Sequence, residues 1–219
     1  FLSIGNFRHA PNWDAVLWLK HSLWPMIRRR LPKAQLHVYG AYTPPKATAL
    51  HNAAEGFHVM NWAEDALQVM SEARVCLAPL RFGAGIKGKL TDAMLCGTPS
   101  VTTPIGAEAM HGDLPWPGLV ADTAEGLADA AARLYSEQPR WEQAQRDGRQ
   151  LLSARYDRRW HGQALVQRIE HTLAHLDEQR LYNFTGAMLR HHHHKSTQYM
   201  AQWIEAKNRP SGGAADTCP

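Results

Sequence analysis

Residues 75–103 constrain the fold of this chain more than any other stretch of it. An apolar run, Val75 to Pro79, leads into a Gly-rich loop with two lysines; a short helical segment follows, and a second apolar run begins after Gly97-Thr98-Pro99. Two apolar strands joined through a helix predict a βαβ unit with parallel strands. Glycines let a backbone approach a bound group, and a helix start offers unpaired N–H groups, so the segment also predicts a phosphate-binding loop.

The same alternation runs through most of the chain. Short apolar segments predict strands, and the segments between them have helical spacing. Such an order indicates an α/β fold: a Rossmann-like, three-layer domain with a parallel sheet and helices on both faces. The expected strands are 1–4, 35–39, 57–60, 75–79, 100–103 and 119–120, and the expected helices are 12–30, 45–54, 63–72, 87–96 and 123–136.

The pattern changes after about residue 137. Segments 139–152 and 157–180 have helical spacing, and 196–207 predicts one more helix. Residues 210–215, Pro-Ser-Gly-Gly-Ala-Ala, are typical of a disordered tail. We therefore expect a Rossmann-like domain with C-terminal helices over 1–178 and a helical or disordered tail over 179–219.

Composition is that of an ordinary globular protein, with 219 residues, 44% hydrophobic and 20% charged. No apolar run approaches the roughly 20 residues that span a bilayer. The three cysteines, Cys76, Cys96 and Cys218, show neither zinc nor disulfide spacing, which favours free thiols and a cytoplasmic location.

The net charge of +4 is uneven along the chain. Residues 1–100 hold 11 Lys and Arg against 6 Asp and Glu, whereas the remainder holds 13 against 14. An anionic small ligand fits this excess, as does peripheral contact with an anionic membrane surface; scattered surface charge fits it equally well. No interleaving of aromatic and basic residues indicates nucleic acid.

The Gly-rich loop supplies the main candidate binding residues. Backbone N–H groups of Gly83, Ala84, Gly85 and Ile86 would receive a diphosphate, as at a helix start. The segment is neither a dinucleotide fingerprint, because the third glycine is missing, nor a Walker A loop, because Leu90 follows Gly-Lys.

Charged residues follow this loop at once. Lys87 or Lys89 would add positive charge to a phosphate site, and Asp92 could accept hydrogen bonds from a ribose diol. The alternative is a plain strand-to-helix turn with a solvated Lys89–Asp92 pair three residues apart.

Three other strand ends carry candidate ligand contacts. Gly5-Asn6-Phe7-Arg8 follows the first strand, and Gly40 ends the second. Asn61 and Trp62 follow the third and could frame a nucleobase, although Trp62 as packing and Asn61 as a helix cap explain them equally well. Ligands of open α/β sheets bind at such strand ends. The run His191–His194 fits a metal or affinity-tag segment, or a solvated polar tail.

These motifs together resemble the C-terminal, donor-binding domain of GT-B glycosyltransferases, specifically the large retaining family 4. The resemblance covers about residues 1–178 and is clearest over Ala78 to Thr103, with its small residue, Pro, Gly-rich loop, acid, Ala-Met, Gly and Pro before a strand. It implies a UDP- or GDP-sugar donor held at the strand ends, with no cofactor and no metal.

The resemblance also implies residue roles. Asp92 falls where the family has a ribose-binding Glu, whereas Ala84 occupies the position of a second Glu. The family places an Arg and a Lys after the first strand to neutralise the leaving diphosphate. Here Arg8 is displaced and Asn12 stands where the Lys would be, so Arg8 and Lys87 are expected to stabilise the leaving group.

A GT-B enzyme has two Rossmann-like domains, and this chain begins at what resembles the second. The N-terminal domain would then be a missing partner, and this chain alone would be an inactive fragment of a hexosyltransferase-type enzyme, one building polysaccharide, a glycan or a lipid-linked product. The expected location is cytoplasmic, with peripheral contact at the inner membrane. Two alternatives stay open: a non-catalytic nucleotide-binding or regulatory module, and a metal-independent sugar-nucleotide epimerase.

Overall fold

The computed structural model describes residues 1–208, apart from the side chains of residues 191–194. The expectations for His191–His194, the tail at 210–215 and Cys218 therefore lie outside the described residues. The chain forms two compact units, Phe1–Asp157 and a second that begins at Arg158. The first unit ends earlier than the expected domain boundary at residue 178, because its last core-forming helix ends at Arg155.

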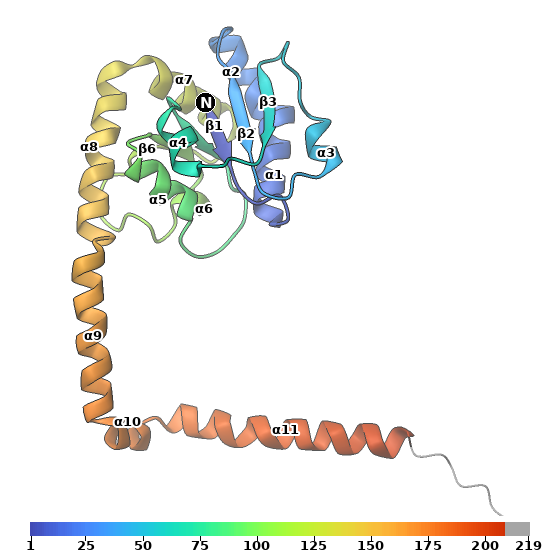
Figure 1. The fold of residues 1–219 in the computed structure, drawn as a ribbon, viewed down its shortest axis with the longest axis vertical. Coiled ribbons are helices and arrows are strands. Elements are labelled where there is room, and N and C mark those ends of the chain that lie inside the picture. Colours follow the sequence, from blue (N-terminus) through green and yellow to red (C-terminus); the bar gives the residue numbers. More distant parts are fainter. Residues whose placement is uncertain (209–219) are drawn as a thin grey trace, which may run out of the picture. The chain divides into compact units, whose positions relative to one another are not determined.

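A six-stranded parallel sheet forms the centre of the first unit, in the order β3-β2-β1-β4-β5-β6 (Figure 1). Each strand overlaps a segment that the apolar runs predict, with β3 and β6 each one residue longer than expected, and so the α/β fold class is confirmed. The bounds are Leu2–Ile4 (β1), Leu36–Tyr39 (β2), Phe57–Asn61 (β3), Cys76–Ala78 (β4), Ser100–Thr102 (β5) and Gly118–Val120 (β6).

Helices cover both faces of this sheet. Residues alternate between the faces along a strand, so Leu77 joins one core cluster while its neighbours Cys76 and Ala78 join two others. One face packs against α1 (Ala10–Trp18), η1 (Leu19–Leu23), α2 (Trp24–Arg30) and α7 (Ala124–Ser136); the other packs against α4 (Ala66–Ser71), α5 (Gly88–Leu95) and α8 (Gln138–Arg155).

Three helices differ from expectation. The helix predicted at 12–30 begins at Ala10, because Pro11 suits a first helical turn, and continues through the π-helical η1 into α2. The segment predicted as 45–54 is helical only over α3 (Pro45–Thr48). Periodicity could not reveal one short helix, α6 (Pro104–Ala107). Its N-cap is Thr103, whose hydroxyl accepts from the Gly106 N–H.

The second unit is helical throughout its described part. It contains α9 (Arg158–Ala174), α10 (Leu176–Tyr182) and α11 (Phe184–Asn208), so the helix predicted at 196–207 is the end of a longer one. No residue of α9 is buried. Among the described helices, none is long and apolar enough to cross a membrane.

Candidate functional site

The sheet order creates a switch point between β1 and β4. From β1 the sheet continues to β2 and β3, and from β4 it continues the other way to β5 and β6. The loops that leave β1 and β4 at their carboxyl ends therefore diverge, and the crevice between them is where open α/β sheets bind ligands. The predicted binding segments at Gly5 and Gly83 lie in these two loops.

The loop after β1 packs tightly against the end of β2. The Gly5 N–H donates to the Tyr39 carbonyl over 3.1 Å, and the Phe7 N–H donates to the Ala41 carbonyl over 3.1 Å. A Cβ on Gly40 would lie 2.3 Å from the Gly5 carbonyl oxygen, so only glycine fits there. Gly5 and Gly40 therefore hold two strand ends close together.

Three contacts fix the base of the loop after β4. The Thr102 hydroxyl donates to the Ala78 carbonyl over 2.6 Å, and the Thr103 hydroxyl donates to the Leu80 carbonyl. The guanidinium of Arg81 forms an ion pair with Asp14 of α1, with Nε 2.8 Å from Oδ2. The segment between Arg81 and Lys87 thus begins from a fixed point.

The loop itself is exposed from residue 81 to residue 86. Gly83 and Gly85 adopt φ angles of +138° and +73°, which L-residues rarely adopt. Ala84 and Ile86 lie in this exposed loop, two or more residues before α5 begins at Gly88. The backbone N–H groups expected to receive a diphosphate therefore precede the first helical turn.

Lys87 stands at the N-cap of α5 and makes no capping hydrogen bond through its side chain. Its side chain is buried, with 8% of the residue exposed. Its Nζ has no hydrogen-bond partner within the described part of the chain. A buried ammonium without an acceptor is costly, and so it indicates a site for an anion.

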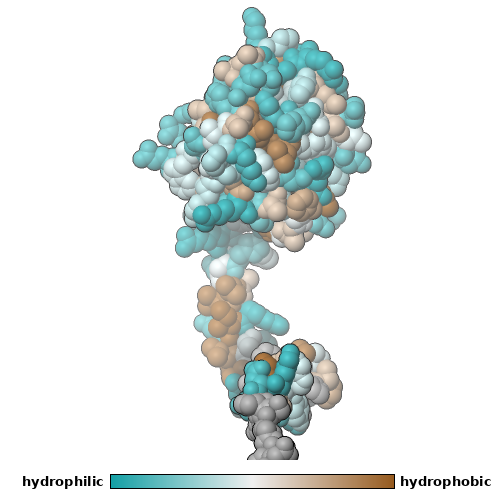
Figure 2. Space-filling view, turned by 90° about the vertical axis from the view of Figure 1, so that its right-hand side faces the viewer, coloured by the Kyte–Doolittle hydropathy of each residue, from teal (hydrophilic) through white to brown (hydrophobic). Residues whose placement is uncertain are grey.

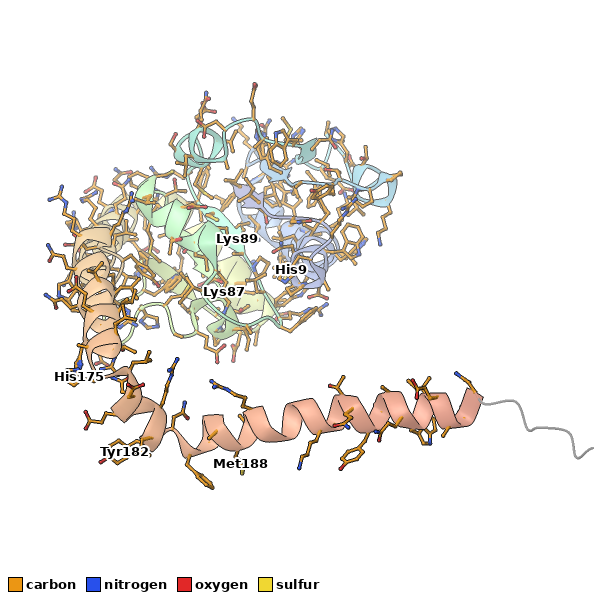
Figure 3. All side chains as sticks on the ribbon, turned by 60° about the horizontal axis from the view of Figure 1, so that its bottom comes forward. His9, Lys87, Lys89, His175, Tyr182 and Met188 are labelled. Carbon is orange, nitrogen blue, oxygen red and sulfur yellow. The ribbon has the colours of Figure 1, made fainter. Side chains whose placement is uncertain are left out.

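Lys89 comes from the first turn of α5, close to Lys87 (Figure 3). Its Nζ lies against Gly5, directly after β1. Its Nζ donates to Oδ1 of Asn12 over 2.8 Å. Burial lowers the pKa of this ammonium to about 8. No ion pair with Asp92 forms in the described structure, so the solvated Lys89–Asp92 turn is not what the structure shows.

Asp92 lies on the next turn of α5 and is half-buried. Desolvation by burial raises the pKa of its carboxyl group, and no ion pair with another described residue opposes this shift. A half-buried carboxylate without a cationic partner keeps its oxygens available as acceptors for a ligand's hydroxyl groups.

The end of β3 presents Asn61 and Trp62 to solvent. Asn61 has a left-handed φ of +63°, and its carbonyl accepts from the Gly40 N–H over 2.7 Å. It is not a helix cap, because Asp65 caps α4 by accepting from the N–H groups of Leu67 and Gln68. Trp62 is 68% exposed, so it is not core packing either.

Arg8 and Asn6 lie in the exposed loop after β1. The Arg8 guanidinium carbon is 3.9 Å from the centroid of the Tyr42 ring, and the Arg8 N–H donates to Asn6 Oδ1 over 2.8 Å. Tyr42 is a neighbour that the sequence analysis missed; its position two residues after Gly40, at a strand end, was the available signal. In the sequence, Asn12 stands out only because it replaces the Lys of the family pattern. Its partner Lys89 is 77 residues away along the chain.

Within the described residues, no group of three or more His, Cys, Asp or Glu side chains is arranged to hold a metal ion. Cys76 is a buried free thiol and Cys96 is a partly buried one.

Solved structures of glycosyltransferases share this fold at low sequence identity. A variant of S. aureus TarM in complex with UDP has a TM-score of 0.59 and 13% identity, covering 71% of this chain and 32% of that one. Pneumococcal O-GlcNAc transferase GtfA, in complex with UDP and GlcNAc, has a TM-score of 0.58 and 17% identity, and the match covers 78% of this chain and 36% of that one. Anabaena HepE, in complex with UDP, has a TM-score of 0.56 and 17% identity, and the match covers 78% of this chain and 48% of that one.

This chain thus spans between 32% and 48% of the length of these proteins. No curated protein sequence matches it. The family model described as "Glycosyl transferases group 1" matches residues 1–137, more than half of the chain. The chain therefore belongs to the group 1 glycosyltransferases.

Proposed function

We propose that this chain is the donor-binding half of an enzyme that transfers a sugar from a nucleoside diphosphate sugar to an acceptor. The single observation that carries this proposal is the ammonium of Lys87, which is buried and has no hydrogen-bond partner among the described residues. It stands at the start of α5, directly after an exposed loop with two left-handed glycines. A diphosphate at this point would supply the acceptor that Lys87 lacks.

The other predicted residues would contact such a donor. N–H groups of the loop from Gly83 to Ile86 would bind the diphosphate, together with Lys87. Asp92 would accept from the ribose hydroxyls, because its carboxylate is free of an ion pair. Gly5, Asn6 and Gly40 would lie beneath the donor. A Cβ on Gly5 would meet the side chains of Asn12 and Lys89, and a Cβ on Gly40 would meet the Gly5 carbonyl oxygen.

Asn61 and Trp62 would receive the nucleobase. The indole of Trp62 is exposed and free to stack on a base, and the Asn61 amide could bond to the base edge. UDP is the first nucleotide to test, because the TarM, GtfA and HepE structures are each described as complexes with UDP; GDP is the second.

Transfer itself would need stabilisation of the departing diphosphate. Arg8, Lys87 and the N-terminus of α5 are the positive groups proposed for this task, since charge that is fixed in place stabilises a developing anion. We propose that these groups act without a metal cofactor. The acceptor, a glycan, polysaccharide or lipid-linked molecule, would bind to an N-terminal Rossmann-like domain joined to this chain.

Nucleotide binding tests the proposal directly. Titration calorimetry of the 219-residue chain with UDP and with GDP should detect binding of one of them. Asp92→Ala should weaken that binding by about 10- to 100-fold, the worth of losing hydrogen bonds to a charged group. Asp113→Ala is the matched control, because Asp113 is an exposed carboxylate in another loop. Binding that survives Asp92→Ala unchanged would contradict the role of Asp92.

Transfer and the non-catalytic alternative are separated by turnover. Membership of a glycosyltransferase family favours an enzyme. The chain joined to its N-terminal domain should release UDP or GDP from the corresponding nucleoside diphosphate sugar. This release should persist in EDTA, which removes metal ions, and Lys87→Met should slow it. Tight nucleotide binding with no turnover would instead identify a binding or regulatory module.

We also propose that the second unit contacts a membrane surface peripherally. Its described helices expose large apolar side chains, and Figure 2 shows them gathered along α9. Residues 158–208 hold seven Lys and Arg against four Asp and Glu. Exposed apolar and aromatic residues with an excess of positive charge are typical of helices that lie on anionic lipid. The exposed residues on α9 are Trp160, Leu165, Val166, Ile169 and Leu173.

Vesicle sedimentation tests this contact. The chain should sediment with vesicles that contain phosphatidylglycerol and remain in solution with pure phosphatidylcholine. A chain that ends at Asp157 should bind neither. Equal binding of the shortened chain would place the contact in the first unit, and the absence of any binding would contradict the proposal.

A further inference from the structure

The ammonium of Lys89 occupies the end of β1, although its backbone belongs to α5. A Cβ on Gly5 would lie 2.7 Å from Lys89 Nζ and 2.7 Å from the side-chain amide of Asn12. Gly5, Asn12 and Lys89 also line the same small pocket at the carboxyl ends of β1 and β4. Three separate segments therefore place one positive charge at the switch point of the sheet.

Asn12 holds this ammonium in a defined position. Its Oδ1 accepts from Lys89 Nζ over 2.8 Å, while its Nδ2 donates to the Asn6 carbonyl over 3.0 Å. The reverse amide orientation would point an NH₂ group at an ammonium and lose both bonds. The side chain of Asn6 in turn accepts from the Arg8 N–H. Bonds therefore run from the loop after β1 to Lys89.

Lys89 has no acidic partner on the elements around it. On α1, Asp14 is paired with Arg81. On α5, Asp92 forms no ion pair among the described residues, and on β4 the nearby titratable group is the Cys76 thiol. Burial without a counter-ion explains why the pKa of Lys89 is lowered. A ligand with negative charge would supply the counter-ion that Lys89 lacks among the described residues.

We propose that Lys89, positioned by Asn12, is the cation that stabilises the leaving diphosphate in place of the Lys that the family pattern puts at position 12. This inference rests on the proposed function. Lys89 is then a catalytic residue, because it contacts the reacting group, and Asn12 is a positioning residue. The charge reaches the end of β1 from the helix after β4 rather than from the loop after β1.

In the transfer step, the bond between the sugar C1 and the diphosphate oxygen breaks, and its electron pair stays on the diphosphate. The acceptor hydroxyl forms the new bond to C1 and loses its proton to solvent. Lys89 would lie against the oxygen that gains charge, while Asn12 keeps the ammonium from moving away. A charge already in position needs no reorganisation as the bond breaks.

Lys87 and Lys89 thus differ in how their ammonium groups are held. No hydrogen bond from a described residue holds the Lys87 ammonium, whereas that of Lys89 donates to Asn12. Both lysines would face the diphosphate, Lys87 from the start of α5 and Lys89 from the end of β1. A comparison of ligands with and without phosphates therefore shows whether Lys89 contacts the diphosphate, and the dependence on Asn12 distinguishes Lys89 from Lys87.

Calorimetry of the 219-residue chain with UDP and with uridine makes this comparison at pH 7. Lys89→Met should weaken UDP binding by about 10- to 100-fold and leave uridine binding unchanged, because the lost contact is to the diphosphate. Lys89→Arg should recover part of the loss. Lys33→Met is the control, since Lys33 is an exposed lysine before β2.

The dependence on pH tests positioning by Asn12. In the wild type, UDP binding should weaken as the pH rises past the pKa of Lys89, and in Lys89→Arg it should stay constant over that range. Asn12→Ala should move the pH midpoint of UDP binding to a lower value, because it removes the acceptor that faces the ammonium. Asn12→Asp should move the midpoint to a higher value, because a carboxylate is a stronger acceptor. A role of Asn12 in packing alone would not move this midpoint.

The outcomes distinguish this inference from the proposed function. A wild-type chain that binds neither UDP nor GDP overturns both. UDP binding that is lost in Lys87→Met but unchanged in Lys89→Met overturns the assignment of Lys89 and leaves the proposed function standing. Should Lys89→Met fail to fold, a wild-type profile with no change between pH 7 and about pH 9 overturns the inference without that variant.

Discussion

The two units place their large apolar side chains in opposite environments. In Phe1–Asp157, Trp24, Leu36 and Phe57 are 1% exposed or less. In the second unit, Trp160, Leu173 and Trp203 are each more than half exposed. Helical spacing of apolar residues is present in both units, and so it predicts a helix without saying what the helix packs against. In the part of the chain that the structure describes, a sheet supplies this packing surface in the first unit and the second unit has only helices.

The largest expected effect compares two tryptophans. Trp24 is 1% exposed, and its Nε1 donates to the Glu55 carbonyl over 2.7 Å. Trp24→Ala should lower the free energy of unfolding by about 3–5 kcal/mol, because it leaves a cavity and an unpaired carbonyl. Trp203→Ala should change it by less than about 0.5 kcal/mol, because Trp203 is 59% exposed. Urea denaturation measures both, and equal effects would remove the contrast between the units.

A smaller effect comes from charge. Burial lowers the pKa of Lys89 to about 8 in the folded chain, against an ordinary value of 10.5. Between these values the unfolded chain binds more protons, so the stability of the wild type should rise as the pH increases through that interval. At pH 7 the ligand-free Lys89→Met chain should be as stable as the wild type or more stable, by up to about 2 kcal/mol.

Denaturation at pH 7 and pH 10 measures this difference, which should shrink at the higher pH. Lys207→Met is the matched control in the second unit; it should show no such change with pH, because Lys207 is exposed. A Lys89→Met chain that is several kcal/mol less stable than the wild type would indicate that Lys89 serves the fold rather than a ligand.

The smallest expected effect comes from removing the second unit. A chain that ends at Asp157 keeps the whole sheet and every residue of the candidate site. Its thermal midpoint in the absence of ligand and its affinity for UDP should both match those of the full chain. A large loss of either would show that the first unit depends on the helices after Arg158, and the comparison between the units would fail.

Much of the fold is predictable from sequence because it depends on local patterns. The apolar runs at Leu36–Tyr39 and Cys76–Ala78 are strands, as expected, since both faces of a parallel sheet are buried. Local sequence also indicates a binding loop at Gly83, Gly85 and Lys87, because two glycines and a lysine directly after a strand are an unusual combination. The short helix α6 carries no such pattern, because four residues are too few to show helical periodicity.

The network around Lys89 was not predictable, because its parts are distant in sequence. Lys89 and Asp92 are spaced as a helical ion pair, so Asp92 was the one side-chain partner for Lys89 that local spacing offered. Asn12 competes successfully for the ammonium because the sheet brings the start of α1 next to the start of α5. Similarly, Asn61 looks like a helix cap until Asp65 is seen in that position.

The sequence by itself determined the α/β class, the strand segments and the glycines that must stand at strand ends, because each follows from local periodicity or backbone geometry. Tertiary structure alone decided that β1 lies beside β4, that Lys87 is buried with no partner among the residues described, and that Lys89 reaches Asn12. The physical reason is the same in each case: burial and pairing depend on which distant segments the sheet brings together, and no local pattern records that.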